Sequence, residues 1–180
     1  CRFKLSDESW GHQEFLSGHV PGAVYAHLNH DLSAPVTGTN GRHPLPDPTA
    51  LARALGRLGI TNATQVVVYD QGEGLYASRL WWSLRYLGHE AVAMLDGGLA
   101  KWTAEGRATT DVVPTPVPVT FEPRPRPAAM GGILDASDIE RTDPRPHDGH
   151  DTTRRSPRPL VPSGRVYVHR STMRPTRMVV

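Results

Sequence analysis

The order of apolar and polar residues between positions 64 and 106 predicts two strands, each followed by a helix. Residues 66–69 are a continuous apolar run, as expected for a parallel strand that is covered on both faces. Residues 77–87 change to helical spacing, with apolar side chains on one stripe. A second apolar run at 92–95 precedes a shorter helix. This βαβα order predicts an α/β domain with a central parallel sheet flanked by helices.

A further helix is predicted upstream, between Asp47 and Gly59. Asp47 is a favoured N-cap, Pro48 fits the first helical position, and Gly59 suits the residue after the helix end. Residues 11–16 carry a weaker helical pattern. The first five residues alternate like the end of a strand, and we interpret the chain as beginning inside its first strand.

The composition changes along the chain. Residues 1–122 hold 9 basic and 12 acidic side chains, whereas residues 123–180 hold 11 arginines, no lysine and 6 acids. Twelve of the 17 prolines lie between Pro114 and Pro175, and their spacing predicts an extended, semi-rigid linker over residues 114–132. Residues 142–180 show no apolar period, so we predict a basic, Pro/Arg-rich, disordered tail. Without interleaved aromatic residues this tail indicates no specific nucleic-acid binding.

The sequence contains one cysteine, Cys1, which excludes an internal disulfide and a thiolate metal cluster. Such usage fits a reducing compartment, and no apolar run is long enough to span a bilayer. We therefore expect a cytoplasmic protein without a membrane partner, metal or cofactor. The chain does not start with methionine, so a targeting segment upstream of it stays an open alternative.

The loop after the first predicted strand is the candidate site of the α/β domain. Its residues are Asp70, Gln71, Gly72, Glu73 and Gly74. Backbone N–H groups at this position, with a helix N-terminus behind them, suit an anion or a thiolate. No cysteine stands in the loop, and its two carboxylates would repel an anion.

Two histidine positions also draw attention. We interpret His19, in a Pro-Gly turn, as a residue that orders its own turn, although a ligand or base is the alternative. Arg42 and His43 precede two prolines that stiffen the backbone behind them. They are either an anion-binding or proton-handling pair or part of a surface turn, and the sequence leaves both interpretations open.

Six motifs in family order make the chain resemble the N-terminal domain of two-domain rhodaneses, the thiosulfate and 3-mercaptopyruvate sulfurtransferases. They are CRF (1–3), GHVPGAVY (18–25), GRHPLPDP (41–48), VVVYD (66–70), RLWWSLRYLGH (79–89) and LDGGLAKW (95–102), and the likeness resumes at ILDASDIER (133–141). The resemblance implies a rhodanese α/β fold. It also implies sulfane sulfur transfer to cyanide or a thiol through a cysteine of the C-terminal domain.

The resemblance also implies roles for single residues. Asp70 takes the position that the catalytic cysteine has in the second domain, and Cys1 matches a strand end rather than the nucleophile. His43 and the nearby Asp31 match groups thought to approach the substrate across the domain interface, where a neutral histidine can pass a proton. Arg42 and Arg141 are candidate binders of an anionic substrate, Arg141 within the second domain.

The resemblance stops after Arg141, and we divide the chain accordingly. Residues 1–113 form the rhodanese-like domain, 114–132 the interdomain linker and 133–141 the start of a second domain. Residues 142–180 lack the motifs of that second domain, which fits either a disordered tail or a shifted reading frame.

Two functional interpretations remain open at this point. The first is a sulfurtransferase polypeptide that lacks its catalytic domain, whose parent uses a small anionic sulfur donor, and which is inactive alone. The second is a non-catalytic rhodanese-like module that binds or regulates a partner through a basic arm.

Overall fold

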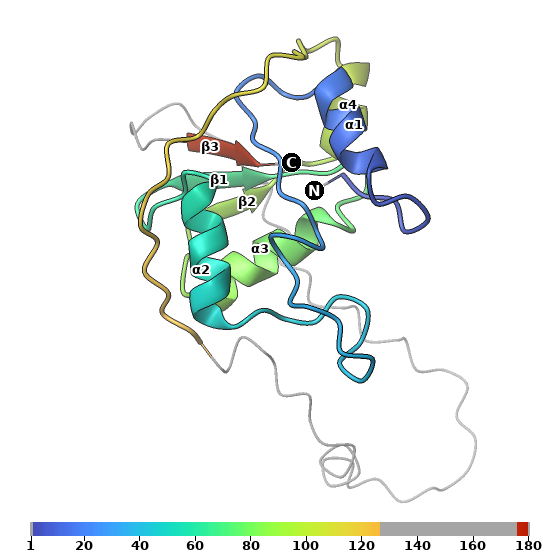
Figure 1. Ribbon diagram of the computed structural model, residues 1–180. Helices are drawn as coiled ribbons and strands as arrows, with labels where there is room; N and C mark the ends of the chain where they lie inside the picture. Colours follow the sequence, from blue (N-terminus) through green and yellow to red (C-terminus); the bar gives the residue numbers. More distant parts are fainter. Residues whose placement is uncertain (1, 127–175, 180) are drawn as a thin grey trace, which may run out of the picture.

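The computed structural model describes residues 2–126 and 176–179 (Figure 1). The strands are parallel and lie in the order β2-β1-β3. The predicted α/β class, with a parallel sheet between helices, is therefore confirmed. In chain order the elements are α1 (Trp10–Ser17), α2 (Pro48–Arg57), β1 (Gln65–Val68), α3 (Ala77–Tyr86), β2 (Val92–Met94), α4 (Gly98–Ala104) and β3 (Thr176–Val179).

Local sequence signals explain the ends of these elements. The Asp47 carboxylate caps α2 by accepting the backbone N–H of Thr49 at 2.8 Å and that of Ala50 at 3.3 Å, as the N-cap prediction requires. Gly59 follows the helix with φ of 75°, a conformation that glycine adopts at no steric cost. Strand β1 begins at Gln65, one residue before the expected start, and its three valines are buried.

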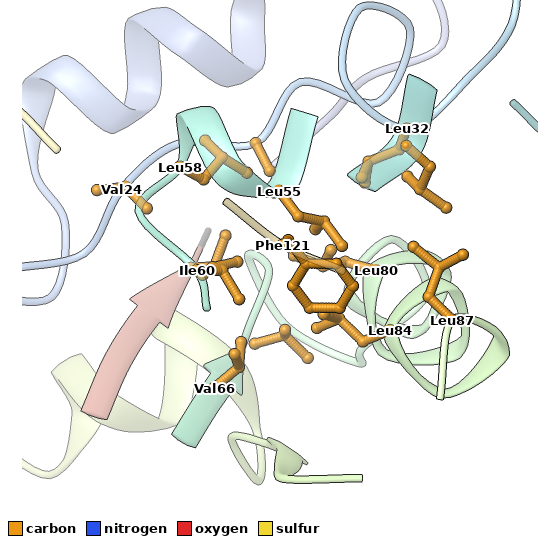
Figure 2. Packing of buried hydrophobic residues seen from close by; sticks show 14 of the residues in the cluster. Val24, Leu32, Leu55, Leu58, Ile60, Val66, Leu80, Leu84, Leu87 and Phe121 are labelled. Carbon is orange, nitrogen blue, oxygen red and sulfur yellow. The ribbon is translucent and has the colours of Figure 1, made fainter. Parts of the chain in front are cut away.

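Helices α2 and α3 cover one face of the sheet, whereas α1 and α4 lie together on the other (Figure 1). Val66 and Val68 project from β1 into the main core because alternate residues of a strand share a face. Figure 2 shows core side chains such as Leu55, Leu80 and Leu84 around Phe121. A second, smaller core packs Phe15 of α1 and Leu99 of α4 against Tyr69.

The C-terminal segment supplies β3, and this corrects one prediction. Thr176–Val179 pair in register with Gln65–Val68, and Val179 has 0% exposure. The expectation of disorder over residues 142–180 is thus wrong for 176–179, while 142–175 lie outside the described residues. Four residues are too few to show a hydrophobic period in the sequence. They form a strand because the backbone of β1 supplies their hydrogen-bond partners.

The start of the described chain also differs from expectation. Residues 2–5 form no strand; Lys4 makes one isolated antiparallel bridge with Asp7. Likewise, Val24 makes only a single parallel bridge, to Val179. The predicted strand end is therefore wrong for residues 2–5, while Cys1 lies outside the described residues. Strand β3 pairs with β1 instead, and Phe3 packs into the main core at 4% exposure.

Residues 107–126 form an extended strap along the domain surface. His19 and Thr110 exchange backbone hydrogen bonds of 2.9 Å in both directions, and Val119 N–H donates to the Gly56 carbonyl at 3.0 Å. Phe121 is 4% exposed within the main core. The part of the predicted linker up to residue 126 therefore packs on the domain. Within the described ranges, no helix has the length and apolar character that crossing a bilayer requires.

Candidate functional site

The loop that leaves β1 is a ring of backbone N–H groups closed around one carboxylate. Asp70 Oδ1 accepts the N–H of Gly72 at 2.9 Å and of Gly74 at 3.0 Å. Its Oδ2 accepts the N–H of Tyr76 at 2.9 Å and of Ala77, the first residue of α3, at 3.2 Å. Asp70 is 2% exposed, so the anion-binding geometry expected here is occupied by the side chain of the loop itself.

This arrangement refines the electrostatic prediction for the loop. The two carboxylates were expected to repel an anion, but only Glu73 is exposed. Asp70 is turned inward and is itself the bound anion. Charge-assisted hydrogen bonds to a carboxylate are roughly twice as strong as neutral ones, so the loop is held in one conformation by its own side chain.

The N-terminus of α4 closes the other side of the loop. Leu99 N–H donates to the Asp70 carbonyl at 3.0 Å, and Ala100 N–H donates to the Gln71 carbonyl at 3.2 Å. The approach is close: a Cβ on Gly98 would lie 2.8 Å from the Asp70 carbonyl oxygen. Gln71 Nε2 donates to the Phe3 carbonyl at 3.3 Å, which ties the loop to the start of the chain.

A cleft of about 330 Å³ lies between the start of the chain and residues 29–43, and no residue of the Asp70 loop lines it. It contains both members of the predicted pair, Arg42 and His43. Three aromatic rings connect it to the loop: Phe3 lies edge-on to His43 at 5.8 Å between ring centroids and to Tyr76 at 5.6 Å. The lining residues are Phe3, Leu5, Glu8, Asn29, Ser33, Ala34, Pro35, Val36, Arg42 and His43.

The surroundings of His43 in this cleft favour the neutral imidazole over the charged form. Burial, together with the positive charges of Arg79 and Arg42, lowers the pKa of His43 below its ordinary value of 6.5. Both ring nitrogens are buried, and neither has a hydrogen-bond partner among the described residues. A neutral imidazole carries one N–H and one lone pair, and in His43 both are left without a partner among the described residues.

Arg79 of α3 fastens the loop that carries His43, a role that the sequence analysis missed. Its guanidinium donates to the Leu32 carbonyl at 3.0 Å and to the His43 and Pro44 carbonyls at 3.2 Å each. The guanidinium thereby holds both ends of residues 32–44, here called the cleft loop, against α3.

The structure does not place Asp31 at the cleft with His43. Its carboxylate accepts the backbone N–H of His27 at 2.9 Å and lies 3.3 Å from the Arg57 guanidinium. Arg42 lines the cleft as an exposed cation. Arg141 and Cys1 lie outside the described residues.

Glu8, His27 and His30 bring their ligand atoms within 4.8 Å of one another. The hydrogen bonding at His27 disfavours a metal ion there. Its Nδ1 accepts the Asn29 N–H at 3.1 Å, so the neutral ring carries its proton on Nε2, which lies 4.0 Å from Glu8. A metal-bound histidine instead keeps a proton on the nitrogen that does not bind.

His19 is structural, as interpreted from the sequence. It is fully buried, its Nδ1 lies 2.8 Å from the Phe15 carbonyl oxygen and its Nε2 lies 3.2 Å from that of Val112. The side chain thus links the end of α1 to the strap.

Comparison with known proteins agrees with this geometry. The family model described as "Rhodanese-like domain" matches residues 9–105. The "Probable 3-mercaptopyruvate sulfurtransferase" of Pseudomonas aeruginosa is 44% identical over 142 residues, which cover 78% of this chain and 49% of that protein. The "Thiosulfate sulfurtransferase" of Bos taurus is 36% identical over 146 residues, which cover 74% of this chain and 44% of that protein. The chain spans about half the length of these relatives.

Solved structures show the same likeness. The crystal structure of SseA from Escherichia coli, described as a 3-mercaptopyruvate sulfotransferase, has a TM-score of 0.60 at 32% identity, over 72% of this chain and 47% of that one. The "3-mercaptopyruvate sulfurtransferase from Leishmania major" has a TM-score of 0.61 at 28% identity, over 67% of this chain and 33% of that one.

Proposed function

The chain belongs to the rhodanese family, and on that premise we propose that it forms the N-terminal, non-catalytic half of a two-domain thiosulfate or 3-mercaptopyruvate sulfurtransferase. In this role it shapes the substrate cleft for a catalytic domain and transfers no sulfur alone. The observation that carries the proposal is the Asp70 carboxylate, which fills the ring of N–H groups where this fold can hold a reactive thiolate.

The chemistry of sulfur transfer is the reason for proposing that the chain is inactive alone. A thiolate attacks the sulfane sulfur of thiosulfate, the S–S bond breaks, and sulfite leaves with the electron pair. Cyanide then attacks the enzyme persulfide, thiocyanate leaves and the thiolate is restored. Both steps need a cysteine thiolate, and a carboxylate cannot replace it because it forms no persulfide.

The cleft supplies what the catalytic domain needs from its partner. Arg42 offers an exposed positive charge, and the neutral His43 offers both a proton donor and an acceptor. With 3-mercaptopyruvate, the C–S bond breaks and a pyruvate enolate leaves, which must take up a proton. We assign His43 to that proton transfer and Arg42 to attraction of the anionic donor.

Asp31 and Arg141 enter this proposal with different roles. Asp31 acts through its hydrogen bond to the His27 backbone and its ion pair with Arg57, which hold the start of the cleft loop. Arg141, which the family resemblance assigns to the second domain, binds the substrate carboxylate from the opposite side.

The test is sulfur transfer from thiosulfate to cyanide, and from 3-mercaptopyruvate, by the purified chain and its Cys1→Ser variant. We expect no turnover above buffer from either protein. Adding the separately expressed C-terminal half of the Pseudomonas aeruginosa relative should then restore turnover, and His43→Ala should lower it more with 3-mercaptopyruvate than with thiosulfate. Turnover that Cys1→Ser abolishes would overturn the proposal, because Cys1 would then be the nucleophile.

The same assay separates the second interpretation, a binding or regulatory module with a basic arm. Saturable binding of a partner by residues 127–180, with no turnover after the catalytic half is added, would favour that module. The filled Asp70 ring is compatible with both interpretations, so the reconstitution decides between them.

A further inference from the structure

The tip of the cleft loop carries an asparagine that is followed by a glycine. Asn40 and Gly41 are both exposed, and Arg42 and His43 of the cleft come directly after them. The sequence contains three asparagines, and of these only Asn40 precedes a glycine. An asparagine carboxamide is an electrophile for the backbone nitrogen of the next residue, and a glycine there has no side chain to block the approach.

Two hydrogen bonds hold the Asn40 carboxamide in place at the loop tip. Its Oδ1 accepts the Thr37 N–H at 2.8 Å, and its Nδ2 donates to the Pro35 carbonyl at 3.0 Å. Attack on the carboxamide carbon puts negative charge on Oδ1, so the Thr37 N–H already bonds to the atom where that charge develops. The loop therefore gives its own side chain the kind of stabilisation that an oxyanion hole gives a substrate.

Gly41 leaves room for the reaction. Its φ is 83°, a conformation that glycine adopts without strain. Apart from its neighbours in sequence, a Cβ at this position would meet no atom of the described residues within 4 Å. The loop tip is therefore open, and water, which the reaction consumes, reaches it.

We propose that Asn40 is a self-modification site, at which the loop converts the asparagine to aspartate or isoaspartate and so changes the charge beside the cleft. The Gly41 nitrogen bonds to the Asn40 Cγ and gives up its proton. The bond from Cγ to Nδ2 breaks, and ammonia leaves with the electron pair and that proton. Water then opens the cyclic imide at either of its two carbonyl carbons, which leaves a carboxylate at position 40. Water is the only co-reactant.

The product changes the loop in two ways. An oxygen replaces the Nδ2 donor, so the hydrogen bond to the Pro35 carbonyl becomes a repulsive contact between two acceptors. The new negative charge also stands two residues from Arg42, which lines the cleft together with the oppositely charged Glu8. The modified chain therefore attracts an anionic sulfur donor less strongly. This consequence rests on the proposed function, whereas the modification itself does not.

Mass spectrometry of the full chain, aged at mildly alkaline pH and then digested, tests the modification. Asn29 and Asn62 are internal controls, because a histidine and an alanine follow them. We expect the peptide with Asn40 to gain the mass of an amide-to-carboxyl conversion several-fold faster than the other two, with isoaspartate among its products. Gly41→Ala should slow this conversion. Reaction at Asn40 no faster than at the two controls would overturn the proposal.

A synthetic peptide of residues 35–42 serves as the reference for the contribution of the fold. Asn40 should react at least as fast in the folded chain as in this peptide, because the folded loop holds the Thr37 N–H on Oδ1. Slower reaction in the folded chain would mean that the two hydrogen bonds protect the carboxamide, which would also overturn the proposal.

Two variants at the same position test the effect on the cleft. Asn40→Asp carries the charge of the product, whereas Asn40→Gln keeps a neutral amide. With the catalytic half added, we expect Asn40→Asp to raise the KM for thiosulfate several-fold over that of Asn40→Gln, with kcat unchanged. Equal KM values would overturn the effect on the cleft. If the parent chain gives no turnover with the catalytic half, the proposed function fails instead, and the mass measurement still decides the modification.

Discussion

The Asp70 carboxylate accepts the backbone N–H of Ala77, the first residue of α3, at 3.2 Å. Through this contact the residue at the end of β1 caps the helix that follows the loop. The cap joins the candidate site to the fold, because the same carboxylate also holds Gly72, Gly74 and Tyr76. Four predictions about the site, the cleft and the strap follow from contacts of this kind.

Asp70→Ala should destabilise the domain by about 3 kcal/mol, because it leaves four partly or fully buried N–H groups without a carboxylate partner. Urea unfolding measures this change. Glu73→Ala is the matched control, since it removes an exposed carboxylate from the same loop and should change the free energy of unfolding by less than about 0.5 kcal/mol. Sulfate should raise the melting temperature of Asp70→Ala more than that of the parent chain, because the emptied ring can accept an external anion. Equal stability of the two loop variants would contradict the capping role.

Arg79→Ala should loosen the cleft loop as well as destabilise the domain by about 2–3 kcal/mol, because three partly buried carbonyls lose a charged donor. The specific readout is hydrogen exchange at Ala34, whose N–H donates to the Pro44 carbonyl at 2.9 Å within that loop. Arg85→Ala is the control on the same helix, where the exposed guanidinium lies over the Trp81 ring. If Ala34 exchanges alike in both variants, Arg79 does not hold the loop.

The imidazole of His43 should titrate below pH 6.5 in the folded chain, because burial, Arg79 and Arg42 all disfavour its charged form. Since the folded pKa is lowered, the unfolded chain binds more protons below about pH 6.5, and the stability contributed by neutral His43 falls as the pH drops through that range. His89, 3% exposed, acts in the same direction, because burial also lowers its pKa.

Nuclear magnetic resonance titration of the histidine ring protons measures the midpoint of His43 in the folded chain. The urea-unfolded chain is the reference for each histidine. A His43 midpoint in the folded protein at or above the unfolded midpoint would refute the desolvated environment.

Phe121→Ala should cost about 3 kcal/mol, because it empties a buried aromatic site in the main core. The exposed Val117→Ala, in the same strap, should be nearly neutral. Thermal and urea unfolding of both variants measure the difference. Similar values would mean that the strap is not an integral part of the domain, which would return the boundary to the position expected near residue 113.

Helix α2, strand β1 and the family resemblance could all be predicted from the sequence alone. The caps of α2 follow from Asp47, Pro48 and Gly59, because capping depends on residues within one turn of the helix end. Burial of β1 on both faces follows from consecutive valines. The six motifs that carry the resemblance are likewise readable in the sequence, and the match over residues 9–105 agrees with them.

Contacts between groups far apart in the sequence could not be predicted from it, because they form only when the chain folds. Four residues near the C-terminus become a buried strand because β1 offers hydrogen-bond partners and a core pocket for Val179, neither of which lies near it in sequence. Arg79 acquires its role because folding brings three carbonyls to its guanidinium. The Asp70 carboxylate turns inward instead of repelling anions, because the backbone of its loop curls around it. Each outcome depends on hydrogen bonds to backbone groups, whose positions in space no residue pattern encodes.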